Sequence, residues 1–273
     1  MDSPTPLKEL DLVATSVADD LGFVALADVG AVFAACGSQA RLIGGHMLTL
    51  HAQRWQLGQD LYRETHDVDL GIAKLLVSQG VALETLLAKG YSKVAGNRFA
   101  RTLPSGRQTK GGPEQALIDV LVPATRTRAR KNIRVGDLAT TEVPGLASAL
   151  QRSAVVVAVT MHRLDGEVLQ AQVPLPDEQS TLILKALAWK ERASPKDAVD
   201  IWRALEIAHA AGVKPDGFLS ADDKAAREIV GSAFAELTST GTQAMVSLQN
   251  LSTRVATLRH TRVRVLSRSV LGL

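Results

Sequence analysis

Three aspartates lie inside short apolar runs, and their placement constrains the chain more than any other feature. Asp67 and Asp69 belong to His-Asp-Val-Asp-Leu-Gly-Ile, and Asp119 belongs to Ala-Leu-Ile-Asp-Val-Leu-Val. Residues two apart on a strand point to the same side, so Asp67 and Asp69 would hold four oxygens over one small volume. Such a volume suits a hard divalent cation, and a neighbouring strand with Asp119 would supply the third carboxylate of a two-metal centre. The alternative is a structural role, which would require a cationic partner for Asp119.

Composition indicates a globular chain without a membrane segment. Of the 273 residues, 46% are apolar and 22% are charged, which is ordinary for a soluble fold. Aromatic residues make up only 4%, so base-stacking platforms are not expected. The single cysteine, Cys36, excludes an internal disulfide. The first residues lack the pattern of a signal peptide, and no apolar run approaches the roughly 18 residues that span a bilayer. We therefore expect a cytoplasmic protein that does not enter a membrane.

Positive charge is unevenly distributed along the chain. The formal net charge is only +3, but arginine and lysine gather in two clusters. Such clusters suit a polyanionic partner such as RNA, although a solvated basic surface is the alternative for either cluster alone. The clusters are Arg126, Arg128, Arg130 and Lys131, and then Arg254, Arg259, Arg262, Arg264 and Arg268.

Apolar periodicity predicts an α/β fold: a mixed sheet with flanking helices over residues 1–176 and a helical domain over residues 177–273. In the first part, Leu7, Leu10, Val13 and Val17 share a helical stripe, which predicts helix up to about Gly37 on the outside of the domain. In the second part, Ser194-Pro195 is a strong helix start. The expected strands are 40–43, 67–72, parts of 91–103, the Asp119 run, 155–161 and 168–173. The other expected helices are 46–55, 81–89, 178–192, 195–212, one from Ser220, and a last one from about Thr242.

Four sequence blocks, in this order, carry a resemblance to a known group of proteins. The blocks are Leu-Ile-Gly44-Gly45-His46, Arg63-x-Thr65-x-Asp67-Val-Asp69-Leu, Ile118-Asp119-Val, and Lys185-x-x-Ala188-x-x-x-Arg192-x-x-x-Lys196-Asp197-x-x-Asp200. Together they resemble the nucleotidyltransferase superfamily typified by DNA polymerase beta. Within that superfamily they resemble the abortive-infection toxin family AbiEii and its MenT relatives.

The resemblance implies roles for the first three blocks. Gly44 and Gly45, between a strand and a helix, would bring backbone N–H groups close to the phosphates of an NTP. Asp67 and Asp69 would hold the Mg²⁺ bound to the triphosphate, and Asp119 would help to hold a second Mg²⁺. His46 stands where many members of the superfamily have serine, so the role of that serine hydroxyl is open here.

The fourth block is expected to contribute to nucleotide binding from the helical domain. Lys185 and Arg192 fall on one helical face, which could grip the phosphates. Asp197 could touch the nucleotide, but its place three residues after Ser194 makes helix capping an equal explanation. Asp200 is better explained as a structural partner of Arg192 or Lys196.

The resulting prediction is an Mg²⁺-dependent enzyme that transfers a nucleotide from an NTP to an acceptor hydroxyl. The resemblance favours a toxin that acts on RNA, with the 3′ end of tRNA preferred, and it implies a cognate antitoxin. One alternative is an antibiotic nucleotidyltransferase, which would need an acidic pocket for a cationic drug. The other is a catalytically silent module that binds nucleotide or RNA.

Overall fold

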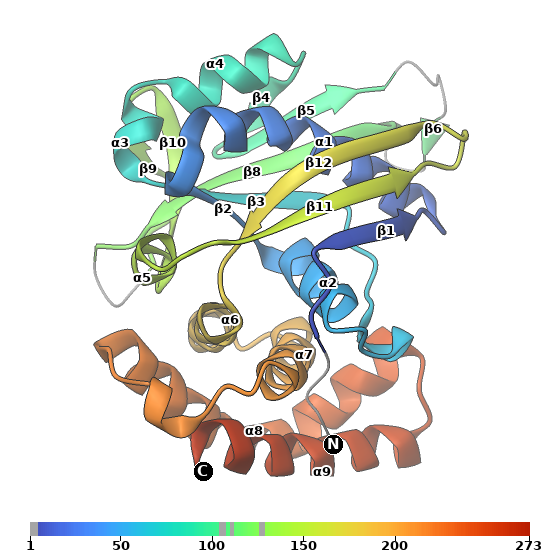
Figure 1. The fold of residues 1–273 in the computed structure, drawn as a ribbon, viewed down its shortest axis with the longest axis vertical. Helices are drawn as coiled ribbons and strands as arrows, with labels where there is room; N and C mark the ends of the chain where they lie inside the picture. The colour runs from blue at the N-terminus through green and yellow to red at the C-terminus, as the bar shows by residue number, and fades with distance from the viewer. Residues whose placement is uncertain (1–4, 104–107, 110–111, 126–128) are drawn as a thin grey trace. The chain divides into compact units, whose positions relative to one another are not determined.

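A computed structural model describes residues 5–103, 108–109, 112–125 and 129–273, and its chain divides into two compact units (Figure 1). The sheet unit comprises Leu7–Met47 and Glu64–Pro176. The helical unit comprises Leu48–Arg63, Asp177–Leu273 and, of the described residues at the start of the chain, Thr5 and Pro6. The segment Leu48–Arg63 therefore groups with the C-terminal helices, although it lies between two strands of the sheet unit in the sequence.

The sheet unit is built on a seven-stranded mixed sheet with β8 at its centre. On one side β8 pairs with β3 in parallel, and β3 pairs with β2 in antiparallel orientation. On the other side the first half of β8 pairs with β5, and its last residues pair with β10. The strands are β2 Ala40–Ile43, β3 Asp67–Ile72, β4 Ser92–Ala95, β5 Arg98–Thr102, β8 Gln115–Pro123, β9 Ile133–Val135 and β10 Leu138–Val143.

Burial alternates along β3 and β8, and this alternation fixes which residues face the core. Val68 and Leu70 of β3 and Ile118 and Val120 of β8 are fully buried. The aspartates lie between them on the opposite, less buried face. A shift of one residue in either strand would bury the acids and expose the apolar side chains, so the hydrophobic pattern sets the register. Shorter elements complete this part of the unit: β6 Gln108–Thr109, β7 Gly112–Pro113, α3 Lys74–Ser78, α4 Val81–Ala88, α5 Leu146–Gln151 and the 3₁₀ turn Gly37–Gln39.

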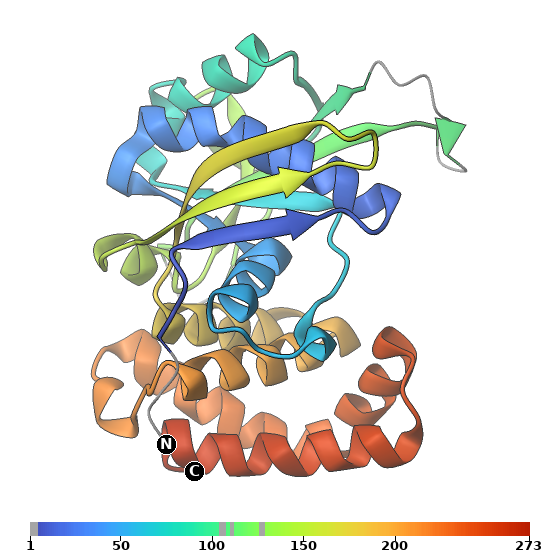
Figure 2. The same ribbon diagram turned by 45° about the vertical axis from the view of Figure 1, so that its right-hand side comes forward.

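A second, three-stranded sheet joins distant parts of the chain (Figures 1 and 2). It consists of β1 Glu9–Val13, β11 Val155–His162 and β12 Val168–Leu175, with β1 parallel to β11. The helix expected from Leu7 onward is therefore wrong for residues 9–13. Leu10 and Leu12 are buried while their neighbours are exposed, which is the alternation of a strand. The predicted strands 155–161 and 168–173 are present, but they belong to this sheet and not to the main one.

Helix α1, Val17–Cys36, starts at the cap residue Ser16 and packs against β12 of the small sheet and against β3 and β8 of the large one. It is thus internal, not on the outside as expected. Among the described residues, the stretch Val17–Gln39 is also long and apolar enough to cross a bilayer, which corrects the expectation that no such run exists. Most of that stretch is buried inside the protein, and packing between two sheets accounts for its apolar composition.

Helix α2 spans Gly44–Arg54, and its last seven residues, from Leu48 onward, belong to the helical unit. In the described part of the chain, this unit also contains four long helices. Within it α6 packs on α7 and α8, and α9 packs on α7 and α8. The expected single helix from Thr242 is wrong, because α8 ends at Gln249, the next residue Asn250 has positive φ, and Ser252 caps a new helix. The helices are α6 Glu178–Arg192, α7 Pro195–Ala210, α8 Ala221–Gln249 and α9 Thr253–Leu271, with 3₁₀ turns at Gln59–Leu61 and Pro215–Gly217. The predicted class, a mixed α/β sheet domain followed by helices, is confirmed.

Candidate active site

The strand register places the three aspartates beside one another. Asp69 of β3 lies directly opposite Asp119 of β8 in the parallel ladder. Asp67 is two residues before Asp69, so it shares the same face of the sheet. The Asp67 side chain is 34% exposed and that of Asp119 is 13% exposed. The sheet thus gathers the predicted carboxylates on one partly accessible face.

Arg98, which the sequence patterns do not single out, binds two of these aspartates. It is the first residue of β5 and pairs with Asp119 in the antiparallel ladder, so the two side chains share a face. Arg98 Nε donates to Asp119 Oδ1 at 3.0 Å, and Nη2 donates to Asp119 Oδ2 at 2.6 Å and to Asp67 Oδ2 at 2.9 Å. The hydrogen bonds with Asp119 raise the pKa of Arg98, and the charges of Asp67 and Asp69 add to this effect. One guanidinium therefore bridges acids from both strands.

The cluster has the donor chemistry that a divalent cation needs. Its donors are carboxylate oxygens, the ligands preferred by Mg²⁺. Arg98 Nη2 already lies within hydrogen-bond distance of oxygens from both Asp67 and Asp119, so this place accommodates positive charge. Among the described residues, no group of three or more acidic, histidine or cysteine side chains is arranged so that it could hold a metal ion directly. The carboxylate oxygens are therefore the right chemical type for a metal ion, but Arg98 engages oxygens of Asp67 and Asp119.

The glycine pair at the start of α2 packs against the acid-bearing block. A Cβ on Gly44 would lie 1.9 Å from Asp69 Oδ2, and the φ of Gly44 is +77°. A Cβ on Gly45 would lie 2.6 Å from Thr65 Oγ1. Neither position can hold a larger residue without moving these side chains. The two sequence blocks therefore form one packed unit, in which Gly44 permits the close approach of Asp69.

His46 follows this pair and is buried against helix α1. A Cβ on Gly22 of α1 would lie 2.9 Å from both His46 Cε1 and Nε2. Gly22 therefore leaves the space that the imidazole fills. His66 lies between Thr65 and Asp67 in the sequence. Its Nε2 forms a hydrogen bond with the Gln115 carbonyl oxygen at 2.9 Å.

In the helical unit, Lys185 belongs to a buried ionic cluster centred on Asp200. Lys185 Nζ donates to Asp200 Oδ2 at 2.8 Å. Arg203 Nη1 and Arg63 Nη2 lie 3.3 and 3.4 Å from Asp200 Oδ1. Burial would raise the pKa of Asp200, but the charges of Lys185, Arg63 and Arg203 outweigh it and lower the pKa to about 2. Two of the sequence blocks thus meet at one carboxylate.

Arg192 pairs with Asp197 and not with Asp200, which corrects the expected partner of Asp200. Arg192 Nε donates to Asp197 Oδ2 at 3.0 Å. Asp197 also accepts from the Ser194 hydroxyl at 2.7 Å, while Ser194 Oγ accepts from the Asp197 backbone N–H at 3.3 Å. The predicted helix cap at Ser194 is therefore confirmed, and Asp197 is part of it.

The two basic clusters are partly neutralised. Arg130 forms two hydrogen bonds with the buried Glu142, which also binds Lys74 at 2.7 Å. The bonds from Arg130 are the largest cause that lowers the pKa of Glu142 to about 2. Arg126 and Arg128 lie outside the described residues. In α9, Arg259 pairs with Asp60 and Arg262 with Glu206, whereas Arg254, Arg264 and Arg268 are exposed.

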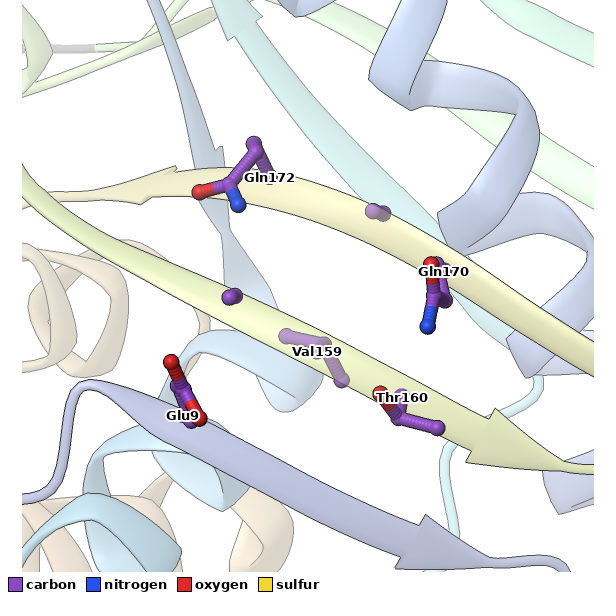
Figure 3. A pocket seen from close by; sticks show the side chains of 7 residues that line it. Glu9, Val159, Thr160, Gln170 and Gln172 are labelled. Carbon is purple, nitrogen blue, oxygen red and sulfur yellow. The ribbon is translucent and has the colours of Figure 1, made fainter.

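A hollow of about 470 Å³ lies elsewhere, on the outer face of the small sheet (Figure 3). Glu9, Thr160, Gln170 and Gln172 line it with polar side chains, and none of the predicted site residues contributes to it. We therefore do not assign the nucleotide chemistry to this hollow.

Comparison with known proteins identifies the class of enzyme. The structure is similar to the crystal structure of an antigenic nucleotidyltransferase-like protein from Paracoccidioides brasiliensis. That similarity covers 81% of this chain and 92% of the other, at 16% identity and a TM-score of 0.44. No curated protein sequence matches the chain. Residues 25–259 match the family described as nucleotidyl transferase AbiEii toxin of type IV toxin–antitoxin systems, and the chain belongs to this family.

Family membership confirms the resemblance found in the sequence. The chain is a nucleotidyltransferase of the toxin class, whose substrate is an NTP and whose partner is an antitoxin. The family favours the toxin over an antibiotic-modifying enzyme.

Proposed function

We propose that this protein transfers a nucleoside monophosphate from an NTP to a hydroxyl group at the 3′ end of a tRNA, and that the reaction depends on Mg²⁺. The observation that carries the proposal is the convergence of Asp67, Asp69 and Asp119 around one cationic group. A toxin of this class acts inside the cell that produces it, so we place the reaction in the cytoplasm.

The three aspartates would hold two Mg²⁺ ions, with Asp67 and Asp69 binding one and Asp119 contributing to the second. Bound there, the ions would neutralise triphosphate charge and lower the pKa of the attacking hydroxyl. The acceptor hydroxyl loses its proton to solvent, its oxygen forms a bond to the α-phosphorus, and the bond from that phosphorus to the leaving pyrophosphate breaks. Gly44 and Gly45, at the N-terminus of α2, would present backbone N–H groups to the phosphates, with His46 beside them.

Lys185, Arg192 and Asp197 of the helical unit are proposed nucleotide-binding residues. Each has a protein partner: Lys185 and Arg192 are ion-paired with acids. Arg192 is 58% exposed and carries donors in a fork that suits phosphate. Lys185 is buried, so we assign it to orienting the helix pair as well as to the nucleotide.

Incubation of the purified protein with cellular RNA and each α-labelled NTP tests this function directly. We expect label on small RNAs of tRNA size with Mg²⁺ present and none when EDTA is added. Label on a protein in the mixture, and not on RNA, would contradict the proposed acceptor. Absence of transfer to any acceptor with all four NTPs would contradict the proposed reaction.

The exposed arginines of α9 support RNA as the acceptor and give a second prediction. Arg264 and Arg268 are one turn apart, and at 100° per residue Arg254 falls within about 80° of both around the helix. The double change Arg264→Ala with Arg268→Ala should reduce the salt dependence of RNA binding by about two units of log K per log salt. Filter binding over a salt series measures this slope.

The control for this prediction removes the same number of positive charges from the sheet unit. Lys93 of β4 and Arg134 of β9 are exposed cations of the sheet unit. Replacing both by alanine should leave the slope nearly unchanged. If both double variants reduce the slope equally, the effect comes only from the general charge of the protein, and the proposed contact between α9 and RNA is contradicted.

A further inference from the structure

Arg98 occupies the position on the sheet face where the proposed catalytic ions would bind. Its Nη2 lies 2.6 Å from Asp119 Oδ2 and 2.9 Å from Asp67 Oδ2. These are oxygens that a metal ion held by the two strands would use. A cation cannot coordinate the same oxygens while the guanidinium sits between them, because both positive groups would require one space.

The backbone holds Arg98 at this place, while its side chain retains room to move. The strand register fixes its Cα opposite Asp119, next to the turn at Gly96 and Asn97. The Asn97 carbonyl oxygen accepts a hydrogen bond from the Val120 N–H at 2.9 Å, which anchors that turn to β8. The Arg98 side chain is nevertheless 39% exposed. It can therefore change rotamer without a change in the sheet.

The guanidinium group also has a second natural partner in the proposed reaction. Its planar fork of donors matches carboxylate and phosphate equally well. A triphosphate brought beside the acids would compete for Arg98 and would at the same time carry its own metal ion to the carboxylates. If Arg98 moved from the carboxylates to the phosphates, the metal ion would pair with the carboxylate oxygens and Arg98 would pair with the phosphate oxygens.

We propose that Arg98 is a resident counter-cation that keeps divalent ions from the acidic cluster in the nucleotide-free protein and moves to the phosphates of an incoming NTP. Metal and nucleotide would then bind together, and the protein without nucleotide would not hold metal ions in a reactive arrangement. This inference rests on the proposed function and adds a regulatory and positioning role for a residue outside the predicted site.

Two binding measurements with opposite expected signs test the inference on the full chain. Mn²⁺ binding without nucleotide is measured by electron paramagnetic resonance, and binding of a non-hydrolysable α,β-methylene NTP in saturating Mg²⁺ is measured by calorimetry. Arg98→Gln should bind Mn²⁺ at least about tenfold more tightly, because a neighbouring positive charge is removed. It should bind the NTP analogue about tenfold more weakly, because a phosphate partner is lost.

Arg134→Gln is the matched control, because it removes one exposed guanidinium from the same unit. It should leave both affinities within about twofold of wild type. Arg98→Lys keeps the charge but loses the fork, so its Mn²⁺ affinity should lie between those of wild type and Arg98→Gln. If Arg98→Gln does not fold, the comparison of Arg98→Lys with wild type decides the question.

The outcomes separate this inference from the proposed function. Equal Mn²⁺ affinity in wild type and the folded Arg98 variant would overturn the role of Arg98 alone. Weaker binding of both Mn²⁺ and analogue by the variant would also overturn it, because it would make Arg98 only a structural partner of Asp119. Failure of wild type and every variant to bind either probe would contradict the proposed metal and nucleotide site itself.

Discussion

Replacing Asp69 by asparagine is expected to lower the rate of nucleotide transfer at least about a hundredfold, because metal ions held by carboxylates supply several kcal/mol of transition-state stabilisation. Asp69 faces Asp119 across the two strands, and its side chain fits closely against Gly44. Asparagine has nearly the same shape, so the packing should survive. Initial rates of label transfer at saturating Mg²⁺ and NTP measure the loss.

The control for this change is Asp137→Asn, which removes the same charge from a side chain that is 88% exposed in the same unit. It should retain the full transfer rate. Thermal unfolding followed by circular dichroism should show both variants within a few degrees of wild type. A large fall in melting temperature for Asp69→Asn, with activity per folded molecule preserved, would make the carboxylate structural.

Replacing Asp200 by alanine is expected to give the largest loss of stability, about 3–5 kcal/mol. The Asp200 side chain is 2% exposed and lies against Lys185, Arg203 and Arg63. Its removal would leave these cations buried without their shared anion. For a chain of this size the change corresponds to a melting temperature roughly 6–20 °C lower, which circular dichroism would detect.

A surface ion pair of the same unit provides the comparison. Asp60 pairs with Arg259 at 2.9 Å, but its side chain is 46% exposed. Exposed pairs contribute at most about 1 kcal/mol, so Asp60→Ala should lower the melting temperature by no more than about 4 °C. Equal melting temperatures for Asp200→Ala and wild type would show that the buried cluster does not stabilise the fold.

The same cluster contributes to the acid sensitivity of the protein. The pKa of Asp200 is about 2 in the folded chain and 3.8 in its ordinary state. A folded-state pKa below the unfolded value means that the contribution is complete above about pH 4 and is lost as the pH falls through about 2. Glu142 of the sheet unit, with a pKa also near 2, acts in the same direction.

The sequence predicted the strands of the candidate site but could not predict their partners in space. β2 and β3 begin and end where the apolar runs do, and the position of Asp119 on a neighbouring strand followed from its apolar flanks. The pairing of Asp69 with Asp119 is different, because register depends on tertiary packing between residues far apart in the sequence. The same holds for Arg98, which meets the acids only through that register.

The predictions from sequence are wrong where the spacing of apolar residues fits both a helix and a strand. Leu7, Leu10 and Val13 are spaced like a helix, but Leu10 and Leu12 alternate with exposed residues and belong to β1. The predicted helix from about Thr242 is also wrong, because it runs through the break between α8 and α9. Asn250 in left-handed conformation and the cap Ser252 were the available signals, but a helical pattern continues on both sides of them.

The location of bound Mn²⁺ tests the central claim most directly. A crystal of the full chain with Mn²⁺ and the α,β-methylene NTP analogue would reveal the ions by anomalous scattering. The proposed function predicts peaks within coordination distance of carboxylate oxygens of Asp67, Asp69 and Asp119, and the inference about Arg98 predicts that its side chain is turned to the phosphates. Ions bound to the nucleotide away from these carboxylates, with Arg98 still bridging Asp67 and Asp119, would contradict it.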